Sequence, residues 1–400
     1  MTYLAIVTVL VAMGVTWILT PVVIRLARYL GAVDLPGGRR THTRPTPRIG
    51  GLAVFLGFVC GLAAAAYFTG SLWSLPRVDV YWRGMVAAAT FLLLVGIVDD
   101  VRGVSFRGKF AAQIAAAAAV WFCGFRIELL SNPFGGTLDL GLLSFPITVL
   151  WIVGITNAVN LIDGLDGLAA GIALITTTSV AVLAYVRGEF GVAAASLALA
   201  GSLVGFLRYN FNPARIFLGD SGSLFLGFVL AVTSVRGSQK GATAVAILAP
   251  LLVLGLPLVD TSLAIVRRLH RLALRGLGTD HALRYVLRNL DHVFLPDREH
   301  IHHRLLDLGF SHRSAVLLLY GVGAVFAAAA FALVLFQSVT VGLVLVGTLA
   351  AAMALFLVAL YLRVWSSAQG HVRARLDGAS PTPPALGGPF RATGGQEGSG

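Results

Sequence analysis

Residues 144–186, SFPITVLWIVGITNAVNLIDGLDGLAAGIALITTTSVAVLAYV, decide the fold class, because they hold two apolar runs joined by a short polar segment. The runs at 144–160 and 167–186 are each long enough to cross a bilayer, which takes roughly 17 to 25 residues. The segment between them combines amide and carboxylate side chains with two glycines that we expect to break the helix. Polar chemistry at the edge of an apolar span predicts a membrane protein with a functional surface at the membrane boundary.

Apolar runs of similar length recur along the chain. Hydrophobic residues make up 57% of the 400 residues and charged residues only 12%, against about 25% charged residues in soluble domains. We therefore expect one transmembrane domain at 1–365, whose longest loop is 267–313, and a disordered tail at 366–400 that is rich in Gly, Pro and Ser. The runs predict an all-α polytopic membrane protein, a bundle of about eleven transmembrane helices, at 3–24, 49–69, 82–98, 110–124, 144–160, 167–186, 190–206, 221–235, 243–266, 314–336 and 339–362.

The distribution of charge predicts the orientation of these spans. With the first loop and the C-terminus on one side, that side holds 24 of the 30 Lys and Arg residues. Because positive residues collect in cytoplasmic loops, we expect the N-terminus outside and the C-terminus in the cytoplasm. The same side receives all nine histidines, which predicts a cytoplasmic active surface. Anionic lipid accounts for the net charge of +12, so no nucleic-acid partner is expected.

The motif GIVDD at 96–100 closes the third span with Asp99 and Asp100. Two adjacent carboxylates repel one another unless a cation or a proton relieves them, and the dipole at a helix C-terminus disfavours them further. A solvated helix end explains one acid but explains the pair poorly. Lys109 and Gln113 follow at the start of the next span, where we expect them to neutralise charge or to hold phosphate.

The segment NAVNLIDGLDG at 157–167 places Asn157, Asn160, Asp163 and Asp166 three residues apart. Each step of three rotates by about −60° around an ideal helix, so these side chains cover a broad polar face. Hydrogen bonds between helices of the bundle could account for the asparagines, but they do not account for two acids beside two glycines. We therefore expect the segment to bend around a ligand.

Two further motifs carry acids or histidines. FLGDSGS at 217–223 opens a span, and its Asp220 suits either a metal or phosphate site or a plain N-cap. In the longest loop, DREHIHHR at 297–304 contains three clustered histidines. Neither a cysteine nor a suitably spaced acid completes a zinc site there. Phosphate handling by His and Arg is therefore the better interpretation.

Two signals are weaker. The segment PTPRIGG at 45–51 follows a basic loop, and a basic loop is the default beside anionic lipid. Asp260 lies inside the ninth predicted span, where a buried carboxylate is rare and needs a partner. It stands seven residues from Arg267 on the same helical face, so a structural ion pair and a functional role both stay open.

Together these motifs resemble the polyprenyl-phosphate N-acetylhexosamine-1-phosphate transferases of glycosyltransferase family 4. Five elements appear in the order of that family, and the likeness extends from residue 34 to residue 320: PRIGG, VDD, NAVNLIDGLDGLAAG, FLGDSGS and HIHHRLLDLG. The His-Ile-His-His signature is similar to the branch that transfers GlcNAc-1-phosphate, whereas the pentapeptide branch usually shows an acid after its histidines. The insertion at 269–295 departs from the family's usual spacing, and residues 281–294 are predicted to add an amphipathic helix.

The resemblance implies that undecaprenyl or decaprenyl phosphate attacks the β-phosphorus of a UDP-sugar, which yields polyprenyl-diphosphate-sugar and UMP. It also implies Mg²⁺ as cofactor, with Mn²⁺ as a substitute, a bacterial cytoplasmic membrane as location, and initiation of a cell-envelope polysaccharide. Phosphoryl transfer is chiefly positioning and electrostatics, with Asp99 as the candidate base. The resemblance assigns a metal to Asp220 with Asp100 and Asp163, catalysis to Asp99, Asp100, Asp163, His302 and His303, and substrate binding to Lys109, Asn157, Asn160, Asp166, Phe217, His300 and Arg304.

Other functions are weighed against this one. A phospho-N-acetylmuramoyl-pentapeptide transferase is the alternative within the family. A transporter would place polar residues near the membrane midplane and show internal repeats, whereas these residues lie at one face and no repeat is visible. A structural protein would not need clustered acids and histidines at one surface. The sequence leaves open a homodimer, and a covalent aspartyl intermediate in place of direct attack.

Overall fold

The computed structural model describes residues 2–36, 44–69, 76–131, 137–238, 254–276 and 301–336, with a few single residues from 344 to 352. The chain divides into a compact unit, Met1–Ala351, and a C-terminal unit, Ala352–Gly400. Of the C-terminal unit the structure describes only residue 352. The predicted tail at 366–400 and most of the eleventh predicted span therefore lie outside the described residues.

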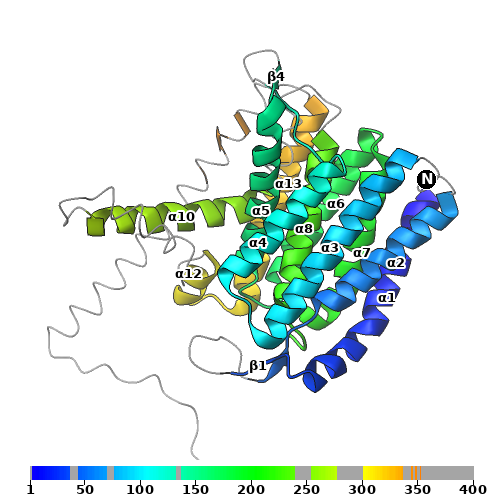
Figure 1. Ribbon diagram of the computed structural model, residues 1–400. Coiled ribbons are helices and arrows are strands. Elements are labelled where there is room, and N and C mark those ends of the chain that lie inside the picture. Colours follow the sequence, from blue (N-terminus) through cyan, green and yellow to red (C-terminus); the bar gives the residue numbers. More distant parts are fainter. Residues whose placement is uncertain are drawn as a thin grey trace, which may run out of the picture. The chain divides into compact units, whose positions relative to one another are not determined.

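The described part of the compact unit is built almost entirely of helices (Figure 1). Two pairs of short strands are β1 (Val33–Asp34) with β2 (Thr46–Pro47) and β3 (Leu129–Ser131) with β4 (Thr137–Asp139), and a 3-10 turn, η1 (Gly141–Leu143), precedes α5. The helices are α1 (Thr2–Tyr29), α2 (Gly51–Thr69), α3 (Pro76–Arg102), α4 (Phe106–Phe122), α5 (Ser144–Ile162), α6 (Leu168–Val186), α7 (Phe190–Asn210), α8 (Gly219–Ser238), α10 (Gly255–Gly276), α12 (Ile301–Asp307) and α13 (His312–Phe336).

Seven of the described helices are long and apolar enough to cross a membrane, namely α1, α2, α3, α5, α6, α7 and α13, and α8 adds a shorter apolar helix at Gly219–Val235. The prediction of an all-α polytopic membrane protein is therefore confirmed. The side of the membrane on which each terminus lies stays a prediction.

Helix α8 lies in the middle of the bundle (Figure 1) and packs against both α3 and α5. Residues 221–235 of this helix are all buried, because a helix that is apolar all round finds its place inside a bundle. The ring of Phe225 on α8 meets Phe55 and Phe58 on α2 edge to face, with centroids 5.5 and 5.6 Å apart. These contacts pack the N-terminal half of α8 against α2, and the starts of the two helices approach closely at Gly51 and Gly222.

The ninth predicted span, 243–266, differs from what the structure describes. Residues 243–253 lie outside the described residues, and α10 continues past the predicted end at 266 to Gly276. The start of the predicted loop 267–313 is therefore helical. Arg267 and Arg268 make this helix amphipathic rather than apolar, and it runs across the direction of α5, which it contacts (Figure 1).

The two strand pairs were not predicted. Both are antiparallel, and in the first of them Val33 pairs with Pro47 and Asp34 with Thr46. This pairing closes the basic loop after α1 into a hairpin. It also brings Asp34 next to Arg48, in the segment that leads into α2.

Candidate active site

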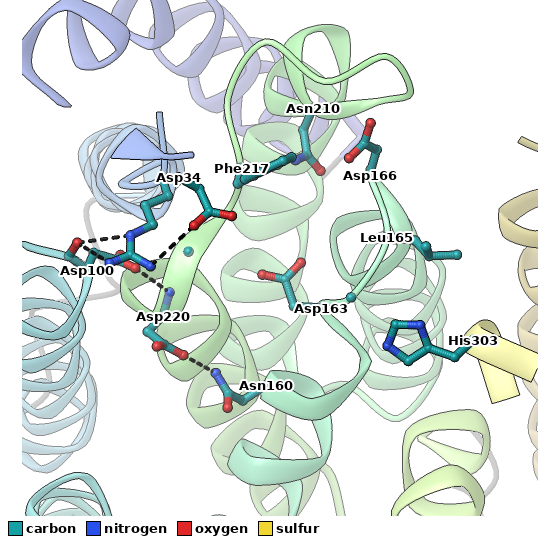
Figure 2. Close-up of a pocket in the computed structure, with 13 residues that line it drawn as sticks. Asp34, Asp100, Asn160, Asp163, Leu165, Asp166, Asn210, Phe217, Asp220 and His303 are labelled. Atoms are coloured by element: carbon teal, nitrogen blue, oxygen red, sulfur yellow. Dashed lines mark hydrogen bonds and ion pairs between the residues drawn. The ribbon is translucent and has the colours of Figure 1, made fainter. Parts of the chain in front are cut away.

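A pocket of about 330 Å³ lies where α3, α5 and α7 end and α6 and α8 begin. Five of its lining residues are aspartates, and Figure 2 shows their carboxylates arranged around Asp163 near its centre. The acids of three separate sequence motifs therefore converge on one space. The lining consists of Asp34, Arg48, Asp100, Asn160, Asp163, Gly164, Leu165, Asp166, Asn210, Phe217, Gly219, Asp220 and His303.

Asp100 joins the end of α3 to the start of α8. Its Oδ1 and Oδ2 accept hydrogen bonds from the backbone N–H groups of Asp220 and Ser221, each at 3.0 Å. It therefore satisfies N–H groups that the first turn of α8 would leave without a partner. Gly219, at φ +74°, permits this approach, because a Cβ there would lie 2.5 Å from Asp100 Oδ2. Arg48 donates two hydrogen bonds to the main-chain oxygen of Asp100, at 3.0 and 2.8 Å.

Lys109 joins the two other acids of this region. Its Nζ lies 2.8 Å from Asp99 Oδ2 and 3.4 Å from Asp220 Oδ2. The amide of Asn160 donates to the other oxygen of Asp220 and to Ser223 Oγ. The expectation that Lys109 neutralises charge beside the acid pair is thereby confirmed. Asp99 is 7% exposed and also accepts from the Val104 N–H.

Asp163 follows the last residue of α5. The helix ends there because Asp163 leaves helical backbone geometry, and α6 begins only after Gly167, at φ +80°. The predicted break of this segment at its glycines is therefore confirmed. Burial raises the pKa of the Asp163 carboxyl well above its ordinary value, and the negative charges of Asp220, Asp100 and Asp166 raise it further. A cluster of this kind favours a cation among its carboxylates.

Asp166 holds the loop between α7 and α8. Its Oδ2 accepts from Asn212 Nδ2 at 2.9 Å and from the Ala214 N–H at 3.0 Å. Asn210, the last residue of α7, donates to the carbonyl of Ile216 in this loop at 3.0 Å. These bonds fix the loop so that Phe217 faces the pocket (Figure 2).

The two described histidines of the HIHH motif have different surroundings. His303 lines the pocket, whereas His302 is 2% exposed and packs on the bare backbone of Gly164. A Cβ on Gly164 would lie 2.2 Å from His302 Nε2. The centroids of the two imidazoles lie 4.4 Å apart. His300, the third histidine, lies outside the described residues.

The pocket takes in most of the predicted site residues. Asn157 points elsewhere, because its amide donates to Gln113 Oε1 and to the Val153 carbonyl in the helix interior. Within the described part of the chain, the predicted residues outside the lining are Asp99, Lys109, Asn157, His302 and Arg304. Those that line it are Asp100, Asn160, Asp163, Asp166, Phe217, Asp220 and His303.

Sequence reasoning missed Asp34, Arg48 and Asn210. Arg48 Nη1 lies 4.0 Å from Asp34 Oδ1, and both residues reach the pocket because the β1–β2 hairpin brings them together. Arg48 belongs to the PRIGG motif, whose weak signal was therefore meaningful. The available sign of Asp34 was its place in the first loop, on the predicted membrane side that also holds the other acids.

The donor set suits a hard divalent cation. Among the described residues, no three His, Cys, Asp or Glu side chains form a ready-made metal cage. Mg²⁺ does not need one, because it takes one or two carboxylates and completes its shell with phosphate oxygens and water. Asp220 and Asp163 fit that requirement, because both line the pocket and the negative charge of Asp220 raises the pKa of Asp163.

Comparison with known proteins places the chain among membrane transferases. The probable undecaprenyl-phosphate N-acetylglucosaminyl 1-phosphate transferase of Bacillus subtilis is 39% identical over 329 residues, which cover 82% of this chain and 84% of the relative. The decaprenyl-phosphate N-acetylglucosaminephosphotransferase of Mycobacterium tuberculosis is 38% identical over 336 residues, covering 78% of each chain. A phospho-N-acetylmuramoyl-pentapeptide-transferase of Staphylococcus haemolyticus is 30% identical over 249 residues, covering 58% of this chain and 75% of the relative.

The family model of glycosyl transferase family 4 matches residues 82–238. This range contains GIVDD, NAVNLIDGLDG and FLGDSGS, the three motifs whose acids meet in the pocket. The resemblance drawn from the motifs is confirmed, and the chain belongs to glycosyl transferase family 4.

Proposed function

We propose that this protein transfers GlcNAc-1-phosphate from UDP-GlcNAc to a polyprenyl phosphate, undecaprenyl or decaprenyl, and releases UMP. One observation carries the proposal: five aspartates line a single pocket at the ends of apolar membrane helices. A lipid phosphate can reach such a pocket while its hydrocarbon chain stays in the bilayer. The two N-acetylglucosamine phosphate transferases described above, at 39% and 38% identity, also have higher identity and coverage than the pentapeptide transferase at 30%.

The residues of the pocket divide the work between the two substrates. Asp166 holds the uracil ring by a hydrogen bond, and Phe217 holds it by stacking. The two residues act together, because Asp166 also fixes the loop that carries Phe217. His303 faces the pocket from the side opposite Asp220 (Figure 2) and contacts the sugar or its diphosphate. Arg304, on the same short helix, supports that grip.

A divalent cation would be held by Asp220 and Asp163, with Asp100 beside them, and Mg²⁺ bound there would neutralise charge on the diphosphate. Asp100 has a second task, because its two oxygens fix the start of α8. Asn160 keeps the carboxylate of Asp220 in place through its bond to it. The chain itself thus orients the acids before any substrate arrives.

Asp99 and Lys109 form a pair at the edge of the pocket. Lys109 holds the phosphate of the lipid, and Asp99 accepts its proton where one is present. The second pKa of a phosphate is near 6, so most of the acceptor is already dianionic at neutral pH and the base has a modest task. Asp99 also keeps the Lys109 ammonium beside Asp220.

We further propose that the protein lies in a bacterial cytoplasmic membrane with this pocket on the cytoplasmic side, where it starts a cell-envelope polysaccharide. The excess of positive residues on one side supports that orientation. The placement of polar residues at helix ends, rather than near the middle of the spans, favours an enzyme over a transporter.

The test uses the purified full-length chain in nanodiscs with undecaprenyl phosphate, Mg²⁺ and radiolabelled UDP-GlcNAc. We expect a lipid-linked radioactive product and an equal amount of UMP. A parallel reaction with UDP-N-acetylmuramoyl-pentapeptide measures the alternative within the family. Equal kcat/KM for the two donors, or preference for the pentapeptide donor, would overturn the assignment to the GlcNAc branch.

A further inference from the structure

The short helix α12 carries His302 and His303, and its first residue is tied to α10. The backbone N–H of Ile301 donates a hydrogen bond to Asp260 Oδ1 at 2.9 Å. Asp260 and Ile301 are 2% and 3% exposed. We propose that Asp260 is a positioning residue, which anchors the start of α12 so that His303 faces the pocket. The catalytic consequence rests on the proposed function, whereas the anchor itself does not.

The need for an anchor follows from the length of α12. A helix of seven residues is far too short to be stable by itself. Its own contacts with the bundle include α13, which follows it in the chain. Asp260 supplies a contact to α10, across 41 residues of sequence. A carboxylate inside a membrane protein is costly unless it is hydrogen-bonded, and the Ile301 N–H at the start of α12 donates a hydrogen bond to it.

The anchor bears on the pocket because the imidazole of His302, which follows it, is buried. His302 follows Ile301 directly and fills the space that Gly164 leaves open. His303, whose ring centroid lies 4.4 Å from that of His302, is the neighbour that lines the pocket. A shift at the start of α12 therefore moves both rings. Within the described residues Asp260 is not part of the pocket lining, so it acts through α12.

The first measurement does not depend on catalysis. The full-length protein in nanodiscs, without substrates, is treated with diethyl pyrocarbonate, and modification of His302 is followed by peptide mass spectrometry. Asp260→Asn keeps an oxygen that can accept the Ile301 N–H, whereas Asp260→Ala removes it. Loss of one hydrogen bond to a charged group predicts about tenfold or faster modification of His302 in Asp260→Ala. Modification in Asp260→Asn should stay within about twofold of wild type, because a neutral hydrogen bond is retained.

The control is Asp307, an exposed acid at the end of the same helix. Asp307→Ala removes a carboxylate from α12 and leaves the anchor intact. In this variant His302 should be modified at the wild-type rate. If Asp260→Ala does not fold, Ile301→Pro removes the donor instead, since proline suits the first position of a helix. Ile301→Ala is then the matched control for the lost side chain.

The second measurement is kcat/KM for UDP-GlcNAc, expected to fall about tenfold in Asp260→Ala and to be largely rescued in Asp260→Asn. If His302 is modified by diethyl pyrocarbonate at the same rate in Asp260→Ala as in wild type, the proposal is overturned. An equal loss of kcat/KM in Asp260→Asn and in Asp260→Ala would overturn it too, because the charge of Asp260 rather than its hydrogen bond would then matter. A wild-type protein that shows the expected protection but transfers no sugar phosphate would instead refute the proposed function and leave the anchor standing.

Discussion

Replacing Asp166 by asparagine separates the role that the structure shows for this side chain, holding the loop, from the role proposed for it, binding uracil. Its Oδ2 holds the loop through Asn212 and Ala214, and Oδ1 is the oxygen available to a uracil N–H. In Asp166→Asn the amide oxygen can take the place of Oδ2 and keep the loop. The amide nitrogen then takes the place of Oδ1, the acceptor for the uracil N–H, so a donor faces a donor.

The magnitude follows from the bond that is lost. A hydrogen bond to a charged group contributes about 1.5–3 kcal/mol, which corresponds to about 10- to 150-fold in affinity. We expect the Kd for UDP-GlcNAc to rise by that factor in Asp166→Asn while the melting temperature changes little. Asp166→Ala loses both loop bonds as well, so its melting temperature should fall clearly.

The assay is calorimetric titration of UDP-GlcNAc into nanodisc-embedded protein, with thermal unfolding measured on the same samples. Asp307→Asn, a change of the same chemistry at an exposed position, is the control and should bind like wild type. Wild-type affinity in Asp166→Asn would refute the reasoning and leave Asp166 as a clamp of the loop alone.

Four further outcomes are expected. Excess chelator should abolish turnover, and full activity in its presence would exclude the metal assignment. Asp220→Asn should abolish metal-dependent nucleotide binding, whereas Asp99→Asn should spare UDP-sugar binding and lower turnover by about 10²- to 10⁴-fold; near-normal turnover in Asp99→Asn would remove it as the base. Asp163→Asn should raise the melting temperature in chelator at neutral pH, because the raised pKa of Asp163 means that its ionised form destabilises the fold above the unfolded-state pKa. That gain should shrink as the pH is lowered towards about 4, near the pKa of an unperturbed aspartate, and a gain independent of pH would contradict it.

The chain's character as a membrane bundle follows from local patterns. Apolar runs long enough to cross a bilayer correspond to α1, α2, α3, α5, α6, α7 and α13, because lipid leaves a spanning segment little choice but a helix. The break between α5 and α6 was predictable for a similar reason, since Gly164 and Gly167 suit a bend. The polar motifs were also predicted from the sequence, because acids at the ends of apolar runs are unusual and need a partner.

Other features depend on which helices meet. The amphipathic helix α10 was predicted as the end of a span and the start of a loop. A helix that is apolar on one face only lacks the continuous apolar run by which spans were recognised. Asn157 and Asn160 are three residues apart on one helix, and only packing directs one to Gln113 and the other to Asp220. No periodicity marks Asp100 as the cap of α8 across 120 residues.

The sequence by itself determined that this chain spans a membrane and that the acids of GIVDD, NAVNLIDGLDG and FLGDSGS lie at the ends of apolar runs, because those properties follow from hydropathy and from residue type along short segments. Only the tertiary structure decided that Asp34 and Arg48 enter the pocket, that His303 rather than His302 lines it, and that Asp260 holds α12. Each of these contacts joins segments far apart in the chain, and its geometry is set by the packing of side chains between helices, which no local pattern of residues encodes.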